Sequence, residues 1–185
     1  MELSTSREGH YVDLEDLLAS RDLRNDCQQQ LLHLYQNKPL ISFMVNMPGP
    51  VKLCELTREL HVACLEELRH AFVGSIIYQE VKLLNTGAEG YLVIDSVPEE
   101  VKRRACGLED GHPLGRLWDI DVHTLDGQIS RETLKLPVRR CLLCNNPAPV
   151  CARSRAHTVE ELVEKIVAIS ESYFADRSQQ ERLIP

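Results

Sequence analysis

Hydrophobic residues recur every three or four positions in several stretches of the chain, and this spacing predicts helices. In one stretch Leu56, Leu60 and Leu68 fall on a single face, and Thr158 with Glu161 forms a capping box before the final stretch. The segment before Pro39 has room for one or two helices. The expected helices span residues 14–36, 53–72, 98–106 and 159–174.

Between these helices the hydrophobic pattern changes to short apolar runs and alternation, which predicts strands. The strands are expected at residues 40–45, 75–84, 91–96 and 117–123, with turns at residues 85–90 and 126–127. Together the elements predict an α+β fold in which helices pack on a mixed or antiparallel sheet. We expect one domain over residues 1–185, ordered from about 14 to 174, with a flexible tail at 175–185.

Composition limits the classes of protein that fit. Hydrophobic residues make up 43% of the chain, which is ordinary for a globular protein. No stretch reaches the roughly 20 apolar residues of a membrane span, and the first residues lack the apolar region of a secretory signal, so we expect a cytoplasmic protein. The net charge of −7 argues against nucleic acid as a partner.

Basic residues are concentrated in one segment of this acidic chain. Residues 127–157 hold six Lys or Arg residues and one acid, a net of +5, which leaves −12 for the rest. Such a basic segment suits a polyphosphate or an acidic protein surface. A solvated surface patch with no specific partner is the alternative.

Two aspartates alternate with apolar residues in the strand expected at residues 117–123. Alternation places Trp118 and Ile120 on one face and Asp119 and Asp121 on the other, with the two acids about 7 Å apart. Like charges at this spacing favour a cation between them, and carboxylate oxygens suit Mg²⁺. A pair of solvated acids on an exposed strand is the alternative, and His123 is expected to be an ordinary histidine.

Three cysteines and a histidine form a second cluster with metal-ligand spacing. Cys141, Cys144, Cys151 and His157 follow the pattern C-x2-C-x6-C-x5-H, which could close a tetrahedral Zn²⁺ site. Because only one C-x2-C knuckle is present, buried thiols in a tight loop and a redox pair remain open. The arginines around this cluster could also present a fork for phosphate groups.

The segment NMPGPVK (46–52) lies between a strand and a helix. Backbone amides at such a turn can bind an anion, with Lys52 beside them, although a simple proline-shaped turn fits the same residues. The segment lacks the glycines of a P-loop.

Several long strings of residues resemble a known family. They are PLIS (39–42), NMPGPVK (46–52), TGAE (86–89), LEDGHPLGRLWDIDV (108–122), ISR (129–131), RRCLLC (139–144) and VCARSRAH (150–157). These strings resemble the CitX family, apo-citrate lyase phosphoribosyl-dephospho-CoA transferase, also called citrate lyase holo-acyl-carrier-protein synthase. The resemblance covers residues from about 14 to 169.

The resemblance implies a transferase that attaches a prosthetic group. Such enzymes transfer the phosphoribosyl-dephospho-CoA part of 2′-(5-triphosphoribosyl)-3′-dephospho-CoA to a serine of the acyl carrier (γ) subunit of citrate lyase, and pyrophosphate leaves. This is a nucleotidyltransferase type of reaction. The fold of simple nucleotidyltransferases is left open, because their glycine-serine turn precedes the first Asp by more residues than Gly115 precedes Asp119.

The chemistry of individual residues suggests roles for them in this reaction. We expect Asp119 and Asp121 to hold Mg²⁺, with Asp121 or a metal-bound oxygen helping to remove the serine proton. Positive charge should stabilise the leaving pyrophosphate or dock the acidic carrier. The expected catalytic arginine is Arg116, the expected substrate-binding residues are Lys52, Arg131, Arg139, Arg140, Arg153 and Arg155, and Glu109, Asp110 and His112 are expected to line the site.

Two other functions remain compatible with the sequence. A non-catalytic module that docks the carrier, or a zinc-stapled assembly module, would bind the apo carrier without releasing pyrophosphate. A metal-dependent phosphohydrolase would consume the triphosphate without the carrier.

Overall fold

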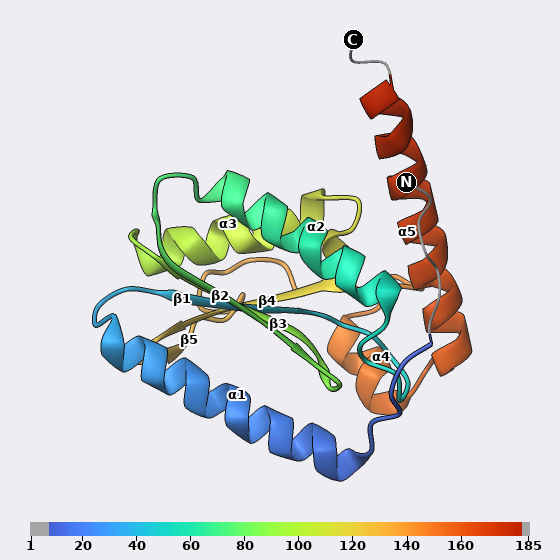
Figure 1. Ribbon diagram of the computed structural model, residues 1–185, viewed down its shortest axis with the longest axis horizontal. Coiled ribbons are helices and arrows are strands. Elements are labelled where there is room, and N and C mark those ends of the chain that lie inside the picture. The colour runs from blue at the N-terminus through green and yellow to red at the C-terminus, as the bar shows by residue number, and fades with distance from the viewer. Residues whose placement is uncertain (1–7, 183–185) are drawn as a thin grey trace.

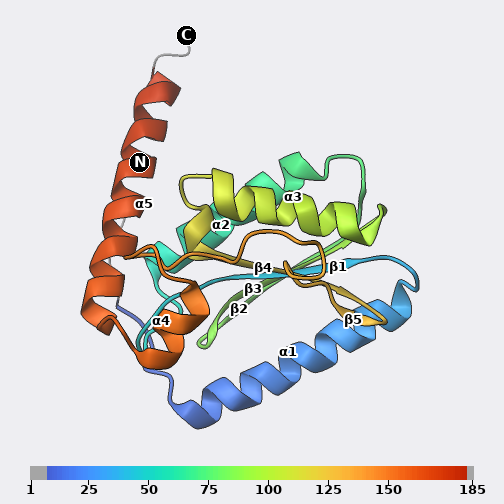
Figure 2. The same cartoon turned by 180° about the vertical axis from the view of Figure 1, so that it is seen from behind.

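The computed structural model describes residues 8–182, in which helices cover both faces of an antiparallel sheet (Figures 1 and 2). The strand order across the described sheet is β2-β3-β1-β4-β5. The strands are β1 (Leu40–Val45), β2 (Ile76–Leu84), β3 (Gly87–Ile94), β4 (Trp118–Thr124) and β5 (Gly127–Gln128). The helices are α1 (Leu14–Leu34), α2 (Glu55–Ala71), α3 (Pro98–Gly111), the 3-10 turn η1 (Gly115–Leu117), α4 (Ala148–Ser154) and α5 (Val159–Arg182). This confirms the α+β class.

The main core lies between the sheet and helices α2 and α3. Leu56, Leu60 and Leu68 of α2 are fully buried there, as their spacing predicts. They pack in one cluster with Phe43 of the central strand β1 and Trp118 of β4. The Trp118 indole N–H donates to the Leu60 carbonyl at 3.1 Å, which satisfies its one polar atom inside the core.

A glycine makes the close contact between β1 and β3 possible. Gly90 faces Phe43 in the strand register, and a Cβ atom on Gly90 would lie 2.1 Å from the Phe43 ring. Because glycine has no side chain, the ring fills that space instead.

Helix α1 crosses the opposite face of the sheet and leaves part of it polar. Its apolar contact is small, a cluster that includes Leu31 and Leu32 of α1 with Leu40 and Val93 of the sheet. In its middle, α1 makes polar contacts instead, such as the Gln28 amide, which donates to the Ser42 hydroxyl at 3.0 Å. The α1 face of the sheet can therefore carry charged groups.

The observed elements differ from the predicted ones mainly at their ends. The turn predicted at residues 85–90 is shorter, because β3 already begins at Gly87. Helix α3 continues to Gly111, and α5 continues beyond 174 to Arg182, into the predicted tail. Helix α4 was not predicted, since its seven residues carry little apolar periodicity. Residues 1–7 and 183–185, included in the predicted domain and tail, lie outside the described residues.

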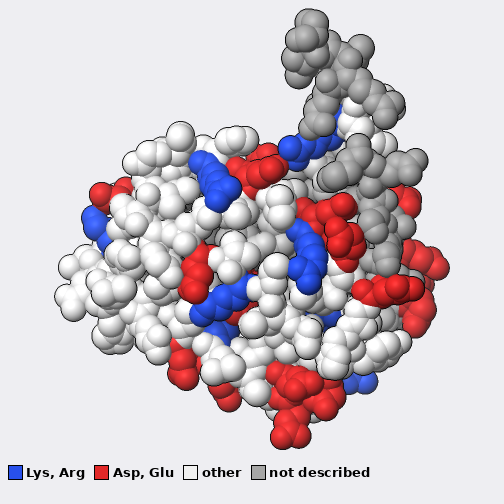
Figure 3. Space-filling model, viewed as in Figure 1, with Lys and Arg blue, Asp and Glu red and all other residues white. Residues whose placement is uncertain are grey.

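Charge is unevenly distributed over the surface. Acidic side chains gather at the lower edge of the face shown in Figure 3, where α1 begins, and at its right-hand side along α5. Among residues 8–182, the structure contains no helix that is both long and apolar enough to cross a membrane.

Candidate active site

Strand β4 presents Asp119 and Asp121 on the face of the sheet that α1 covers. Trp118 and Ile120 alternate with them and enter the core on the other face. In the β1–β4 register Asp121 lies opposite Ser42, which α1 contacts. The Asp119 side chain keeps 48% of its surface exposed, so a ligand can reach it.

The surroundings of this pair disfavour negative charge. Burial raises the pKa of Asp119, and the neighbouring Asp121 raises it further, although Arg139 acts in the opposite direction. Burial also raises the pKa of Asp121, against the effects of Lys102 and of the Gln128 amide, which donates to its carboxylate at 2.6 Å. Because the pKa of both acids is raised, their ionised forms are disfavoured. A divalent cation beside them would stabilise the ionised forms.

Arg139 lies at the start of β4, next to Asp119. Its guanidinium donates to the carbonyl of Trp118 at 2.6 Å and to that of Arg116 at 2.8 Å. The same group lies 3.4 Å from the carboxylates of both Asp119 and Glu109. Arg139 is therefore fixed to the backbone through one nitrogen while another faces the carboxylates.

Glu109 of α3 is the buried centre of a charged network. One carboxylate oxygen accepts from the Ile120 amide at 3.0 Å, and the other accepts from Arg131 at 2.6 Å. Arg131 also makes two hydrogen bonds to Asp110, at 2.7 and 3.0 Å. From the same helix, the Lys102 ammonium donates to the Ile120 carbonyl at 3.0 Å. These bonds join α3 to the edge of β4, so Glu109 and Arg131 hold the site together.

Arg116, in the 3-10 turn before β4, lies near two other arginines. Its Nε atom is buried and has no hydrogen-bond partner among residues 8–182. Burial lowers the pKa of Arg116, and the nearby Arg139 and Arg131 lower it further, although Asp110 acts in the opposite direction. A half-buried guanidinium beside two other arginines favours an anion, such as a phosphate group.

Among the described residues, no hydrogen bond or ion pair joins the other predicted phosphate ligands to the two aspartates. Lys52 donates to the Met47 carbonyl at 2.7 Å, and Arg140 donates to the Asn145 carbonyl at 2.8 Å. Arg153 and Arg155 are exposed in and directly after α4. The predicted roles of these four residues in substrate binding stay predictions.

His112, which was expected to line the site, lies on the core side of the sheet. Its ring stacks on Trp118 with centroids 4.5 Å apart and meets the ring of Tyr173 edge-on. His123, expected to be an ordinary histidine, has a half-buried side chain whose pKa is lowered by burial.

A third carboxylate on the α1 face was not predicted from the sequence. Glu89 of β3 is buried and accepts from Arg24 of α1 at 2.8 Å and from the Tyr91 hydroxyl at 2.6 Å. Met44 of β1 separates Glu89 from Asp119 in the sheet register. The polar residues in the middle of α1 could have indicated such a partner. A helix with so little apolar surface needs polar groups on the sheet to contact.

The cysteine cluster forms a separate group of possible metal ligands. The donor atoms of Cys141, Cys144, Cys151 and His157 all lie within 4.8 Å of one another. This set could bind a metal ion such as zinc.

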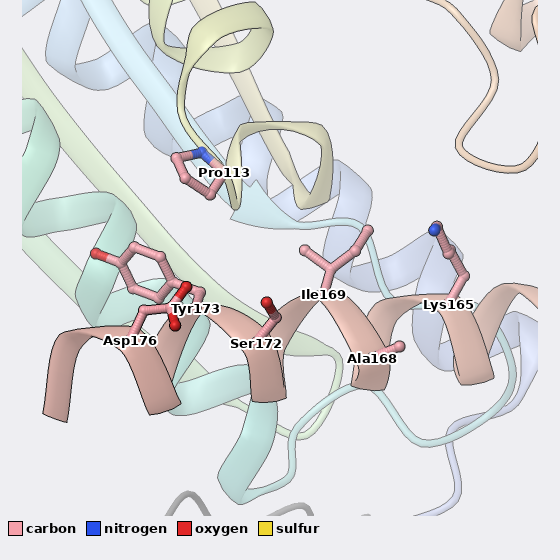
Figure 4. A pocket seen from close by; sticks show the side chains of 7 residues that line it. All are labelled: Pro113, Lys165, Ala168, Ile169, Ser172, Tyr173 and Asp176. Atoms are coloured by element: carbon pink, nitrogen blue, oxygen red, sulfur yellow. The ribbon is translucent and has the colours of Figure 1, made fainter. Parts of the chain in front are cut away.

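A pocket of about 330 Å³ lies along α5, lined by none of the aspartates, arginines or cysteines described above (Figure 4). Most of its wall is one side of α5, including Ile169 and Tyr173, with Pro113 facing it from the loop after α3. None of the predicted site residues lines it, so it is not the site that the aspartates and arginines form.

Comparison with known proteins adds a family to this geometry. Residues 12–173 match the family model described as apo-citrate lyase phosphoribosyl-dephospho-CoA transferase. A relative of that name from Escherichia coli O9:H4 (strain HS) is 42% identical over 164 residues, which cover 86% of this chain and 89% of the relative. Relatives of the same name from Shigella flexneri serotype 5b (strain 8401) and Citrobacter koseri (strain ATCC BAA-895 / CDC 4225-83 / SGSC4696) are 41% and 40% identical, with the same coverage.

Proposed function

The chain belongs to the apo-citrate lyase phosphoribosyl-dephospho-CoA transferase family, and from this we propose that it attaches the prosthetic group of citrate lyase. The donor is 2′-(5-triphosphoribosyl)-3′-dephospho-CoA, and the acceptor is a serine hydroxyl of the acyl carrier (γ) subunit. The serine oxygen forms a bond to the α-phosphorus, the bond from that phosphorus to the bridging oxygen breaks, and pyrophosphate leaves.

One observation supports this reaction most directly. At the start of β4, the Asp119–Asp121 pair, whose pKa values are raised, lies beside Arg139, and Arg139 in turn lies near Arg116. A triphosphate carrying a divalent cation presents both charges at once. Acidic and basic side chains that lie side by side therefore suit a triphosphate with its bound cation.

The carboxylates of Asp119 and Asp121 fit Mg²⁺ by their chemistry. Both are hard oxygen donors on one face of a strand, and the pKa of each is raised in the absence of a cation. When bound, Mg²⁺ would neutralise part of the phosphate charge. In our proposal these two residues hold that ion, and Asp121 also accepts the proton that the serine hydroxyl loses.

The arginines act on the leaving group. Arg116 has an Nε–H group without a hydrogen-bond partner among residues 8–182, and Arg139 is held by two backbone carbonyls. Preorganised positive charge of this kind stabilises a leaving pyrophosphate without reorganisation during the reaction.

The test is to incubate the protein with the donor, Mg²⁺ and the apo γ subunit, and to weigh the carrier by intact mass spectrometry. We expect the carrier to gain the prosthetic group only in the complete mixture. Asp119→Asn and Asp121→Asn should each lower the rate at least about a hundredfold. Asp126→Asn, in the exposed turn after β4, is the matched control and should keep the wild-type rate.

Three results would contradict the proposal. Loss of the triphosphate without the carrier would indicate a phosphohydrolase, and tight carrier binding without a mass gain would indicate a docking or assembly module. Full activity of both Asp119→Asn and Asp121→Asn would leave the transferase activity but remove the proposed site.

A further inference from the structure

The loop that contains Cys141 and Cys144 is folded so that both thiols point to one place. Arg140 and Pro147 form a β-bridge, and the Cys141 amide donates to the Asn146 carbonyl at 2.8 Å. The chain between them therefore makes a tight turn. Cys151 reaches the same place from α4, and His157 reaches it from the connection between α4 and α5.

The spacing of the four donor atoms is close to that of a tetrahedral metal site. With Zn–S bonds of about 2.3 Å, the donors of a tetrahedral zinc ion lie about 3.8 Å apart. The Sγ atoms of Cys144 and Cys151 are 3.5 Å apart, and all four donors lie within 4.8 Å of one another. Only small side-chain movements separate this arrangement from a four-coordinate site.

Two further observations favour a metal over ordinary buried thiols. The Leu143 amide donates to Sγ of Cys141 at 3.5 Å, a bond that favours a thiolate. The Nε2 atom of His157 is buried and has no hydrogen-bond partner among residues 8–182. Buried polar atoms are normally paired, and the orphaned nitrogen shows that this cluster lacks a partner for its histidine.

We propose that Cys141, Cys144, Cys151 and His157 bind one structural Zn²⁺ ion. Four protein ligands complete the tetrahedral shell, which leaves no position open for substrate. A disulfide between Cys144 and Cys151 would account for two of the four donors and leave Cys141 and His157 unexplained. An iron–sulfur cluster fits less well, because such clusters are typically held by four cysteines.

The ion would fix the segment that delivers Arg139. Residues 129–157 contain only two buried side chains, Leu134 and Cys151, so apolar packing does little to order them. The metal would tie the loop after Arg140 to α4 and to the start of α5. This proposal does not depend on the chemistry at Asp119 and Asp121.

The test measures metal directly in the full-length protein, purified under reducing conditions without added metal. We expect one zinc per chain by elemental analysis, and the same stoichiometry by native mass spectrometry. Replacement by Co²⁺ should give the intense thiolate-to-cobalt absorption of a tetrahedral site. Cys144→Ser should lose the metal, while Cys27→Ser, at a half-buried cysteine outside the cluster, should keep it.

If Cys144→Ser does not fold, the wild-type metal content and cobalt spectrum still decide the question. Only traces of zinc in the wild type would overturn the proposal. A metal-free protein that is lighter by two hydrogens after purification without reductant would overturn it in favour of a disulfide. Full zinc occupancy in a folded Cys144→Ser variant would also overturn it.

Discussion

The sheet with α2 and α3 is held together by different forces from the segment of residues 129–157. In the first region, side chains such as Leu60 and Trp118 are removed from water almost completely. In the second, Arg131 and Arg139 form ion pairs and backbone hydrogen bonds, and four possible metal ligands converge. The protein therefore uses apolar burial for its frame and polar contacts for the segment that completes its site.

The largest change in the free energy of unfolding is expected from a substitution in the apolar region. Trp118→Ala removes a fully buried ring and the indole hydrogen bond to Leu60, and should lower the free energy of unfolding by about 3–5 kcal/mol. Urea denaturation measures this change. Val73→Ala, at an apolar residue that is 80% exposed, is the control and should change stability by less than about 0.5 kcal/mol. A similar loss in both variants would show that burial is not the main force.

The second prediction concerns the junction between the two regions. Glu109→Gln keeps an acceptor for the Ile120 amide but leaves Arg131 and Arg139 without their shared charge. We expect a loss of about 2–3 kcal/mol, since Arg131 retains Asp110. Hydrogen exchange should become faster in residues 129–157 and change less in β1 and β3.

Glu99→Gln, at an exposed acid on the same helix, serves as the control for this experiment and should leave both measurements unchanged. Unaltered exchange in residues 129–157 of the Glu109 variant would mean that another contact holds the segment.

A third prediction uses pH to probe the apolar region. His61 is buried against Phe43, and burial lowers the pKa of His61 to about 4. The unfolded chain binds a proton near pH 6.5 while the folded chain does not, so stability is lost as the pH falls below 6.5. By pH 5 the wild type should have lost about 2 kcal/mol relative to His61→Leu.

The matched control for His61 is His70→Leu, an exposed position on α2. Thermal unfolding between pH 7 and pH 5 provides the measurement. A His61→Leu variant that follows the wild-type pH dependence would assign the acid sensitivity to other groups.

The apolar region could be predicted from the sequence because its signals are local. The run Leu40–Val45 was predicted as a buried strand and is β1, and the alternation in Trp118–Val122 correctly separated core residues from the two aspartates. Each of these signals arises from neighbouring residues whose spacing matches the period of one element.

The polar contacts could not be predicted, because they join residues that are distant in the chain. Nothing near Glu109 indicates that Arg131, Arg139 and the Ile120 amide converge on it. The contacts of Glu89 could not be predicted either, because its partner Arg24 lies far away in the sequence, on α1. The cysteine cluster is the exception, because metal ligands have a recognisable spacing, and its four donors do come together.

The smallest expected effect on stability is at Asp119, where the two kinds of force meet. Because its pKa is raised, the folded protein holds the proton more tightly than the unfolded chain does. Ionisation therefore destabilises the fold, and wild-type stability should fall relative to Asp119→Asn as the pH rises above about 4. At neutral pH the variant should be more stable, by less than about 1 kcal/mol because water screens a half-exposed carboxylate.

Magnesium should reverse this order. An ion held by Asp119 and Asp121 stabilises the folded state of the wild type by mass action, and it binds Asp119→Asn more weakly. Thermal unfolding should therefore show Asp119→Asn to be more stable than the wild type without Mg²⁺ and less stable than the wild type with it. If Asp119→Asn were destabilised already without Mg²⁺, its contact with Arg139 at 3.4 Å would outweigh the repulsion from Asp121, and the pair would serve stability instead of cation binding.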